Sequence, residues 1–135
     1  SDERVAAIAM KSLKEVTYHQ ERSADTVIGL GDGTPESHAK MQEALDRLWP
    51  YVGELFEADA IDDAIAQEGI APDPASLRGK FDSVVAEVMR EATLVIPESR
   101  FAHRGGRDGS RHTEHLGHML ATMQFLPRAY PDARW

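Results

Sequence analysis

The sequence contains no cysteine, which excludes disulfide bonds, thiolate catalysis and zinc sites with cysteine ligands. Basic residues are also scarce: 15 Lys and Arg stand against 23 Asp and Glu, for a net charge of −8. This balance argues against a nucleic-acid-binding protein, which needs a basic face for the phosphates. No apolar run approaches the ~20 residues of a membrane helix, and no charged-then-apolar leader opens the sequence. We therefore expect a soluble, cytoplasmic protein with no nucleic-acid partner and no membrane partner.

The composition is that of a folded globular protein. Hydrophobic residues make up 41% of the chain and charged residues 28%, so wholesale disorder is not expected. A length of 135 residues suits a single domain, and such a domain buries roughly two thirds of the surface that its unfolded chain exposes. We therefore expect one helical domain over residues 1–135.

Apolar residues recur three or four positions apart along most of the chain, the spacing that places side chains on one helix face. This spacing predicts helices over residues 4–30, 35–57, 61–68, 75–92 and 112–126. Pro50 should kink the second helix near residues 46–49 because proline removes a backbone donor, and Pro127 should end the last helix. Residues 93–96 are rich in β-branched side chains and are typical of an extended segment. The predicted fold class is all-α.

The first predicted helix is the element around which the others should pack. At 1.5 Å per residue, residues 4–30 make a rod of roughly 40 Å, long for a helix of a water-soluble protein. Its apolar residues form a stripe, and its charged residues lie largely elsewhere. Because a single helix cannot cover its own stripe, we expect it to be one member of a helical bundle.

Glutamate and histidine occur four residues apart in two predicted helices, and two further histidines lie near the second pair. The residues are Glu15 and His19 in the first helix and Glu114 and His118 in the last, with His112 and His115 beside them. Residues four apart share a helix face, so each pair could ligate a metal ion.

The spacing of these pairs differs from that of carboxylate-bridged di-iron bundles, which use Glu-x-x-His on two helices. The position three after Glu15 is Tyr18, and the position three after Glu114 is Gly117. Each pair misses the di-iron pattern by one residue, or about 100° of helix rotation. Two interpretations stay open: a metal site, or structural roles in which the first pair makes buried hydrogen bonds and the last histidines line a surface contact.

A second candidate site is the predicted loop of residues 100–111. Its arginines surround three glycines: Arg100, Arg104, Arg107 and Arg111 lie around Gly105, Gly106 and Gly109. Arginine forks beside permissive glycine backbone can hold an anion such as phosphate, and a helix that starts at His112 would add its N-terminus. The alternative is a solvated loop in which the glycines only turn the chain.

Several strings of the sequence resemble one family, the C subunit of phenylacetyl-CoA epoxidase, also called ring-1,2-phenylacetyl-CoA oxygenase. The strings are residues 11–19, 30–37, 48–56 and 112–117, together with Leu120, Met123, Gln124 and the ending 130–135. The resemblance runs from about Ala6 to Trp135, which is nearly the whole chain.

The resemblance implies a ferritin-like helical bundle in which residues 4–30 are the fourth core helix and the C-terminal helices follow. It also implies that residues 1–135 are the C-terminal portion of a larger subunit. In this family the A subunit holds the di-iron centre that uses O₂ to epoxidise the aromatic ring of phenylacetyl-CoA. The C subunit has lost the metal site and supports the A subunit structurally, a reductase delivers electrons from NADPH, and a small B subunit completes the complex.

The resemblance leads to our first hypothesis, a non-catalytic structural subunit with no catalytic, cofactor-binding or metal-binding residues of its own. The di-iron cofactor belongs to the partner A subunit, and we expect an oligomer that also includes the B and reductase subunits. The alternative hypothesis is a metal-dependent helical-bundle enzyme with a di-iron-like site formed by Glu15, His19, Glu114 and His118. A third hypothesis is that the arginine loop recognises the phosphates of coenzyme A or an acidic patch on a partner.

Overall fold

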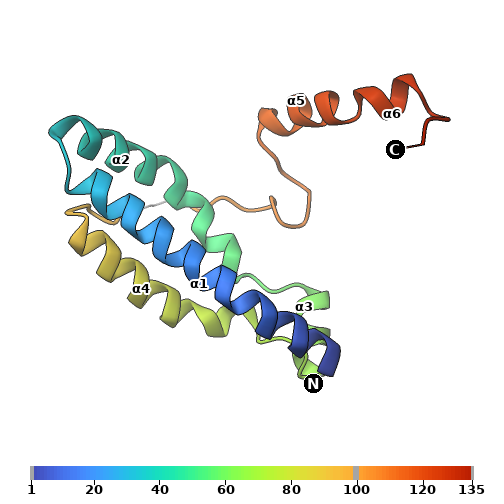
Figure 1. The fold of residues 1–135 in the computed structure, drawn as a ribbon, viewed down its shortest axis with the longest axis horizontal. Coiled ribbons are helices and arrows are strands. Elements are labelled where there is room, and N and C mark those ends of the chain that lie inside the picture. The colour runs from blue at the N-terminus through green and yellow to red at the C-terminus, as the bar shows by residue number, and fades with distance from the viewer. Residues whose placement is uncertain (1, 99–100, 135) are drawn as a thin grey trace. The chain divides into compact units, whose positions relative to one another are not determined.

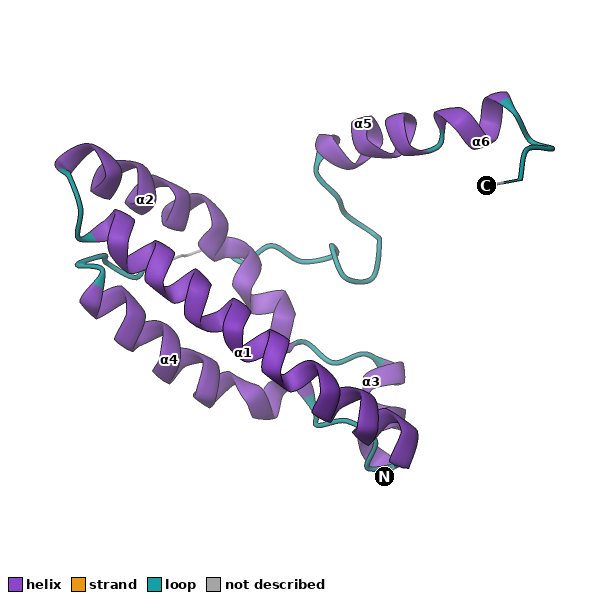
Figure 2. Cartoon of the chain, viewed as in Figure 1, coloured by secondary structure: helices purple, strands orange, loops and turns teal. Residues whose placement is uncertain are grey.

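The computed structural model of the chain describes residues 2–98 and 101–134 (Figure 1). These residues form helices and loops and no strand (Figure 2), which confirms the all-α class. The helices are α1 (Glu3–Gly31), α2 (Pro35–Leu48), η1 (Trp49–Phe56), α3 (Ala60–Gln67), η2 (Pro74–Leu77), α4 (Arg78–Glu91), α5 (Glu114–Met123) and α6 (Phe125–Ala129), with η denoting 3₁₀-helix.

The chain divides into two compact units, Ser1–Ala102 and His103–Trp135, called unit 1 and unit 2 below. The expectation of one domain over residues 1–135 stays a prediction.

The long first helix is confirmed to within one residue at each end. Asp2 caps α1, and its carboxylate accepts hydrogen bonds from the backbone N–H groups of Arg4 and Val5, both at 2.9 Å. The helix ends at Gly31, where the N–H of Asp32 still donates to the carbonyl of Ile28 at 2.8 Å.

The second predicted helix is interrupted where Pro50 enters it. Thr34 caps α2 and exchanges side-chain-to-backbone hydrogen bonds with Ser37 as a capping box, and Pro35 occupies the first helical position. The α-helix ends at Leu48 and continues as the 3₁₀-helix η1. The change from α-helix to 3₁₀-helix lies at the place where the kink was predicted. The prediction of one helix to residue 57 is wrong in its type after Leu48, because proline lacks an N–H and crowds the carbonyl four residues earlier.

The predicted helix over residues 75–92 begins as the 3₁₀-helix η2 and continues as α4. At its end the N–H of Leu94 donates to the carbonyl of Met89 at 2.9 Å, and the N–H of Thr93 donates to the carbonyl of Arg90 at 3.3 Å. These two bonds define a Schellman cap, in which the residue after the helix is left-handed and is usually glycine. Thr93 takes that position with φ of 58°, the one positive φ of a non-glycine residue in the described part of the chain. The segment that follows is irregular, neither helix nor strand.

Unit 2 contains a shorter final helix than the sequence predicts. Helix α5 begins at Glu114 rather than at residue 112, and Gln124 separates it from the single-turn-length α6. The prediction that Pro127 ends the last helix is wrong. Pro127 lies in the first turn of α6, where the backbone N–H has no helical acceptor and proline is therefore tolerated.

Within unit 1, α1 packs against both α2 and α4, which flank it in Figure 1. The aromatic rings of Phe56 in η1 and Phe81 in α4 meet edge to face at 5.1 Å, and the guanidinium of Arg78 lies 5.0 Å from the Phe56 ring. Burial is nonetheless sparse, since Ala92 and Leu94 are the only buried hydrophobic residues among those that the structure describes. No described helix is long and apolar enough to cross a membrane.

Candidate functional site

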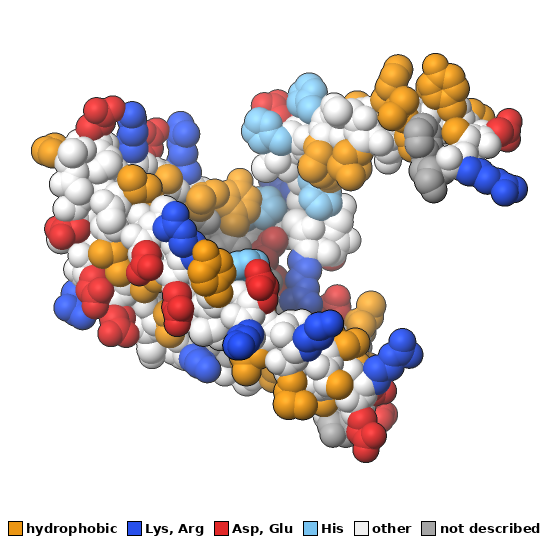
Figure 3. Space-filling model, viewed as in Figure 1, with side chains coloured by type: hydrophobic (Ala, Val, Ile, Leu, Met, Phe, Trp, Pro, Cys, Tyr) orange, Lys and Arg blue, Asp and Glu red, His pale blue; other side chains and the backbone are white. Residues whose placement is uncertain are grey.

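The apolar stripe of α1 is covered at one end only. Near the C-terminal end, Ala24, Val27 and Ile28 are half-buried against the neighbouring helices. Toward the N-terminus, Leu13 is 64% exposed and Val16 is 56% exposed, although both continue the stripe at helical spacing. The other large apolar residues exposed in this half of α1 are Val5, Ile8, Met10 and Tyr18. Figure 3 shows hydrophobic side chains on the surface where Figure 1 draws the N-terminal end of α1.

Grooves run on both sides of this helix. One lies between α1 and α4, has a volume of about 350 Å³ and is lined by Gln20, Phe81 and Val84 among others. The other lies where α1 turns into α2, has a volume of about 410 Å³ and includes Leu30 and Met41. The groove between α1 and α4 adds to the apolar surface of the exposed stripe, and together they make α1 suited to binding another helical surface.

The opposite end of α1 is closed by a tight backbone contact with the end of α4. A Cβ atom at Gly31 would lie 2.5 Å from the carbonyl oxygen of Ala92 and 2.8 Å from its Cβ, so only glycine allows this approach. The carbonyl of Gly31 lies 2.7 Å from Nδ1 of His38, which donates in the tautomer that carries its proton there. The Thr93 hydroxyl donates to the same carbonyl at 3.4 Å.

Gln42 of α2 fixes the segment that follows α4. Its side-chain amide donates to the carbonyl of Val95 at 2.8 Å, and its amide oxygen accepts from the N–H of Val95 at 2.9 Å. One side chain thus satisfies both backbone groups of a residue in irregular structure. Sequence reasoning missed Gln42 and its neighbour His38. The available signal was their i, i+4 spacing on the α2 face that meets α1.

Glu15 and His19 pair with one another on the surface of α1. His19 Nε2 lies 3.0 Å from Glu15 Oε1, and the two side chains are 65% and 73% exposed, respectively. The expectation that they make buried hydrogen bonds to neighbouring helices is therefore wrong. The reason is that they belong to the N-terminal half of α1, which no other helix of unit 1 covers.

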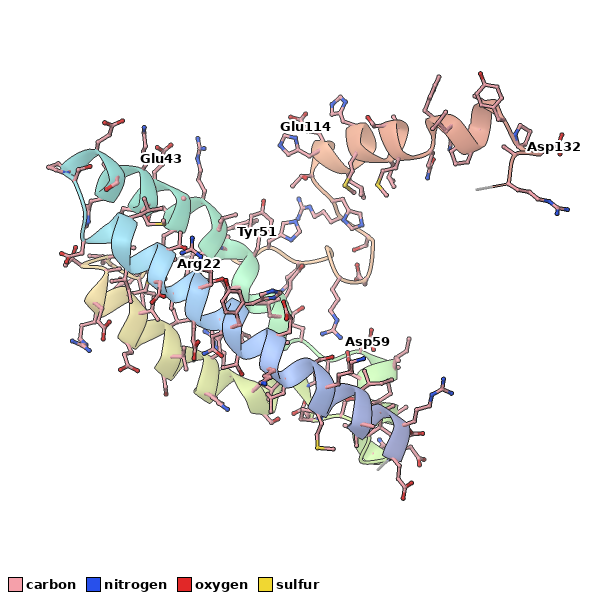
Figure 4. The ribbon with its side chains drawn as sticks, in the orientation of Figure 1. Arg22, Glu43, Tyr51, Asp59, Glu114 and Asp132 are labelled. Atoms are coloured by element: carbon pink, nitrogen blue, oxygen red, sulfur yellow. The ribbon has the colours of Figure 1, made fainter. Side chains whose placement is uncertain are left out.

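Glu114 and His118 lie one turn apart on α5, with Glu114 in the first turn of that helix (Figure 4). Both residues are exposed, as are His112 and His115, which agrees with a surface position. Across the described parts of the chain, no group of three or more histidine, aspartate or glutamate side chains is arranged to hold a metal ion. The alternative of a metal-dependent enzyme stays a prediction.

The arginine loop is turned by two glycines in the left-handed region. Gly105 has φ of 93° and Gly109 has φ of 77°, and the N–H of Arg111 closes the loop by donating to the carbonyl of Gly105 at 2.8 Å. Arg100 lies outside the described residues. The prediction that the next helix starts at His112 is wrong by two residues, since α5 begins at Glu114 with Thr113 as its N-cap residue.

A carboxylate also lies within this loop and opposes the binding of an anion. Asp108 accepts a hydrogen bond from the backbone N–H of Ser110 at 2.8 Å. The Ser110 side-chain hydrogen bond, followed by this backbone bond, lowers the pKa of Asp108 below its ordinary value of 3.8. The carboxylate is therefore ionised at neutral pH and offsets part of the positive charge of the arginines.

A family model and a curated relative both match the chain along nearly its whole length. A family model described as "Phenylacetic acid catabolic protein" matches residues 1–135. Over 134 residues, the chain is 46% identical to the C subunit of 1,2-phenylacetyl-CoA epoxidase from Escherichia coli (strain K12). The alignment covers 99% of this chain and 54% of that protein, so the chain spans about half the length of the curated relative that it matches.

Proposed function

Because this chain belongs to the family of phenylacetic acid catabolic proteins, we propose that it acts as a non-catalytic structural subunit of a phenylacetyl-CoA monooxygenase complex. The family match and the strand-free described structure confirm an all-α, ferritin-like helical bundle. The activity is the ring 1,2-epoxidation of phenylacetyl-CoA in aerobic phenylacetate catabolism, a cytoplasmic pathway in this proposal.

The observation that carries the proposal is the uncovered apolar stripe on the N-terminal half of α1. Leu13 and Val16 are more than half exposed, whereas the same stripe is covered near Val27. Burying apolar surface contributes about 25 cal/mol per Å², so an exposed stripe of this length favours association with another apolar surface. In the proposal, that surface belongs to the catalytic subunit, and the contact holds its metal-bearing helices in place.

We further propose that the chain is the C-terminal portion of a longer ferritin-like subunit and that α1 is its fourth core helix. The share of the relative that the chain covers, 54%, supports its being part of a longer subunit, and the resemblance of its sequence strings favours the C-terminal part. A bundle of core helices also explains why α1 is a rod of 29 residues with an apolar stripe along its full length.

The di-iron centre belongs to the catalytic subunit in this proposal. The donor set of this chain supports that division, because Tyr18 and Gly117 stand where a Glu-x-x-His pattern built on Glu15 or Glu114 would require histidine. The B and reductase subunits complete the complex, and the chain itself holds no cofactor.

The test is co-purification of a tagged catalytic subunit with this chain after co-expression. The double variant Leu13→Ser/Val16→Ser removes two side chains worth together about 3 kcal/mol when buried, so we expect about 100-fold weaker association. Val95→Ser is the matched control, since Val95 is also exposed but lies outside α1. Unchanged recovery and unchanged epoxidase activity with the double variant would refute the docking role of α1.

A further inference from the structure

The segment that follows α4 lies beside the turn that joins α1 to α2 (Figure 1). We call residues 93–98 the strap; it belongs to unit 1 and is neither helix nor strand. The strap begins with Thr93, a β-branched residue held at φ of 58° in the left-handed region. That conformation is unfavourable for any residue with a Cβ, and most of all for a β-branched one. Such strain persists only where the surroundings hold the backbone in place.

Polar groups of α1 and α2 hold the strap at two points. At its first residue, the Thr93 hydroxyl oxygen lies 3.4 Å from both the carbonyl oxygen of Gly31 and Nδ1 of His38. Two residues later, the side-chain amide of Gln42 bonds both backbone groups of Val95. His38 and Gln42 are four positions apart, so the two side chains share one face of α2. The strap is thus fastened to α2 by side chains rather than by a backbone ladder.

The residue just before the strap is held more firmly than the strap itself. Ala92 is buried and in close contact with Gly31, and its N–H donates to the carbonyl of Val88 at 2.9 Å. Within the strap, the N–H of Leu94 donates to the carbonyl of Met89 at 2.9 Å, and the Leu94 side chain is 7% exposed. One buried side chain and a few hydrogen bonds therefore offset the strain of the left-handed residue. The boundary between firmly and weakly held structure lies directly after Ala92.

We propose that the strap is a releasable element, which opens as one unit while α1, α2 and α4 stay folded. In the open form Thr93 returns to an ordinary φ, Leu94 leaves its buried position and Val95 separates from Gln42. Relief of the strain favours opening, whereas the buried side chain and the hydrogen bonds oppose it, so opening requires less free energy than global unfolding. Release frees the side chains of His38 and Gln42, and a partner that binds this face of α2 would therefore favour the open form. The device does not depend on the proposed function.

The experiment is native-state amide hydrogen exchange of the 135-residue chain, measured for each residue by NMR at increasing urea concentrations below the unfolding transition. The amides of Leu94 and Val95 should exchange through an opening that depends little on urea, because release of the strap exposes little surface. The amide of Ala92 should be better protected, since its bond to the Val88 carbonyl stays within α4. Exchange of Leu94 and Val95 with the free energy and urea dependence of the most protected amides of α1 would overturn the proposal. A complete lack of protection at these two amides would also overturn it, because no closed strap would then exist.

The variant Gln42→Met tests whether the strap opens as a unit. It removes both bonds to Val95 and keeps the approximate length of the side chain. In a cooperative strap, exchange of the Leu94 amide should become about 10-fold faster together with that of Val95, although Leu94 bonds to Met89 and not to Gln42. Gln67→Met is the matched control, because it makes the same change in α3 and should leave both amides unaffected. Faster exchange at Val95 alone would mean that only one local bond was lost, and the proposal would fail.

A comparison of Thr93→Gly with Thr93→Ala tests the contribution of the strain. Both variants lack the hydroxyl group, but only glycine adopts the left-handed conformation without a steric penalty. The closed strap is therefore favoured in Thr93→Gly, and its Leu94 and Val95 amides should exchange about 5-fold more slowly than those of Thr93→Ala. The most protected amides of α1 report any change in global stability in the same experiment. Equal or faster exchange in Thr93→Gly would show that strain at this residue does not drive opening, and the proposal would be overturned.

Discussion

The contact between Gly31 and Ala92 yields the sharpest prediction for the stability of the fold. In the variant Gly31→Ala, the new Cβ would lie 2.5 Å from the Ala92 carbonyl oxygen, a distance that real Cβ atoms do not show. Both groups belong to the ends of packed helices, so neither can give way as a flexible side chain could. Gly29 is the matched control, because it lies in the same helix and a Cβ there would meet nothing within 4 Å.

The expected magnitude is the difference of two effects. Replacing glycine by alanine in a helix stabilises it by about 1 kcal/mol, and Gly29→Ala should show this gain. Gly31→Ala carries in addition the cost of overpacking, about 3 kcal/mol when backbone is involved, so the net effect is a loss of about 2 kcal/mol. The two variants should thus differ by about 3 kcal/mol. In a domain of about 100 residues that difference corresponds to more than about 10 °C in Tm.

The assay is thermal and urea unfolding of the full chain followed by circular dichroism, with a check that the urea m-value is unchanged. The double variant Gly31→Ala/Ala92→Gly should recover only part of the loss, because it removes the Cβ at 2.8 Å and leaves the carbonyl oxygen at 2.5 Å. If Gly31→Ala were as stable as Gly29→Ala, the close approach of α1 and α4 would be refuted.

Three further predictions concern local features. Thr93→Gly should raise the free energy of unfolding by about 0.5–1 kcal/mol, because relief of the left-handed φ outweighs the loss of the 3.4 Å hydrogen bond to the Gly31 carbonyl. A lower Tm for this variant would mean that the hydroxyl contact contributes more than the backbone strain costs. The pKa of Asp108, measured by NMR, should lie below 3.8 and should rise in the variant Ser110→Ala. Because a lowered pKa favours the ionised carboxylate, the turn is stabilised above pH 3.8 and loses this stabilisation as the pH falls through the lowered pKa. An Asp108 pKa that Ser110→Ala leaves unchanged would contradict this prediction. Purified protein should contain no stoichiometric iron that depends on Glu15 and His19, and iron lost from Glu15→Ala/His19→Ala would favour the metal-dependent enzyme.

The features that the sequence predicted well are local ones. The end of the first helix near residue 30 and the start of the second at Pro35 depend on residues within one turn, and both agree with the structure. The break near Pro50 was also predictable, because proline acts on its own backbone and on the turn before it. Helix ends that depend on nearby residues could thus be inferred from spacing and residue type alone.

The features that the sequence did not predict depend on residues far apart in the chain. Gln42 and Val95 are 53 positions apart, and Thr93 and Gly31 are 62 apart, so no periodic pattern links them. The pairing of Glu15 with His19 was predictable from their spacing, but their exposure was not. Exposure depends on which helices cover α1, and helical spacing indicates only which residues share a face.

The sparse interior has a consequence for the amount of this protein in a cell. A chain in which Ala92 and Leu94 are the buried hydrophobic residues of the described part gains little folding free energy from its own interior. A molecule that binds only the native state adds stabilising free energy by mass action. The folded fraction of the chain then rises with the concentration of that molecule. In the proposed complex, we expect copies produced in excess of the other subunits to unfold more often and to be degraded faster, so that the abundance of this chain follows theirs.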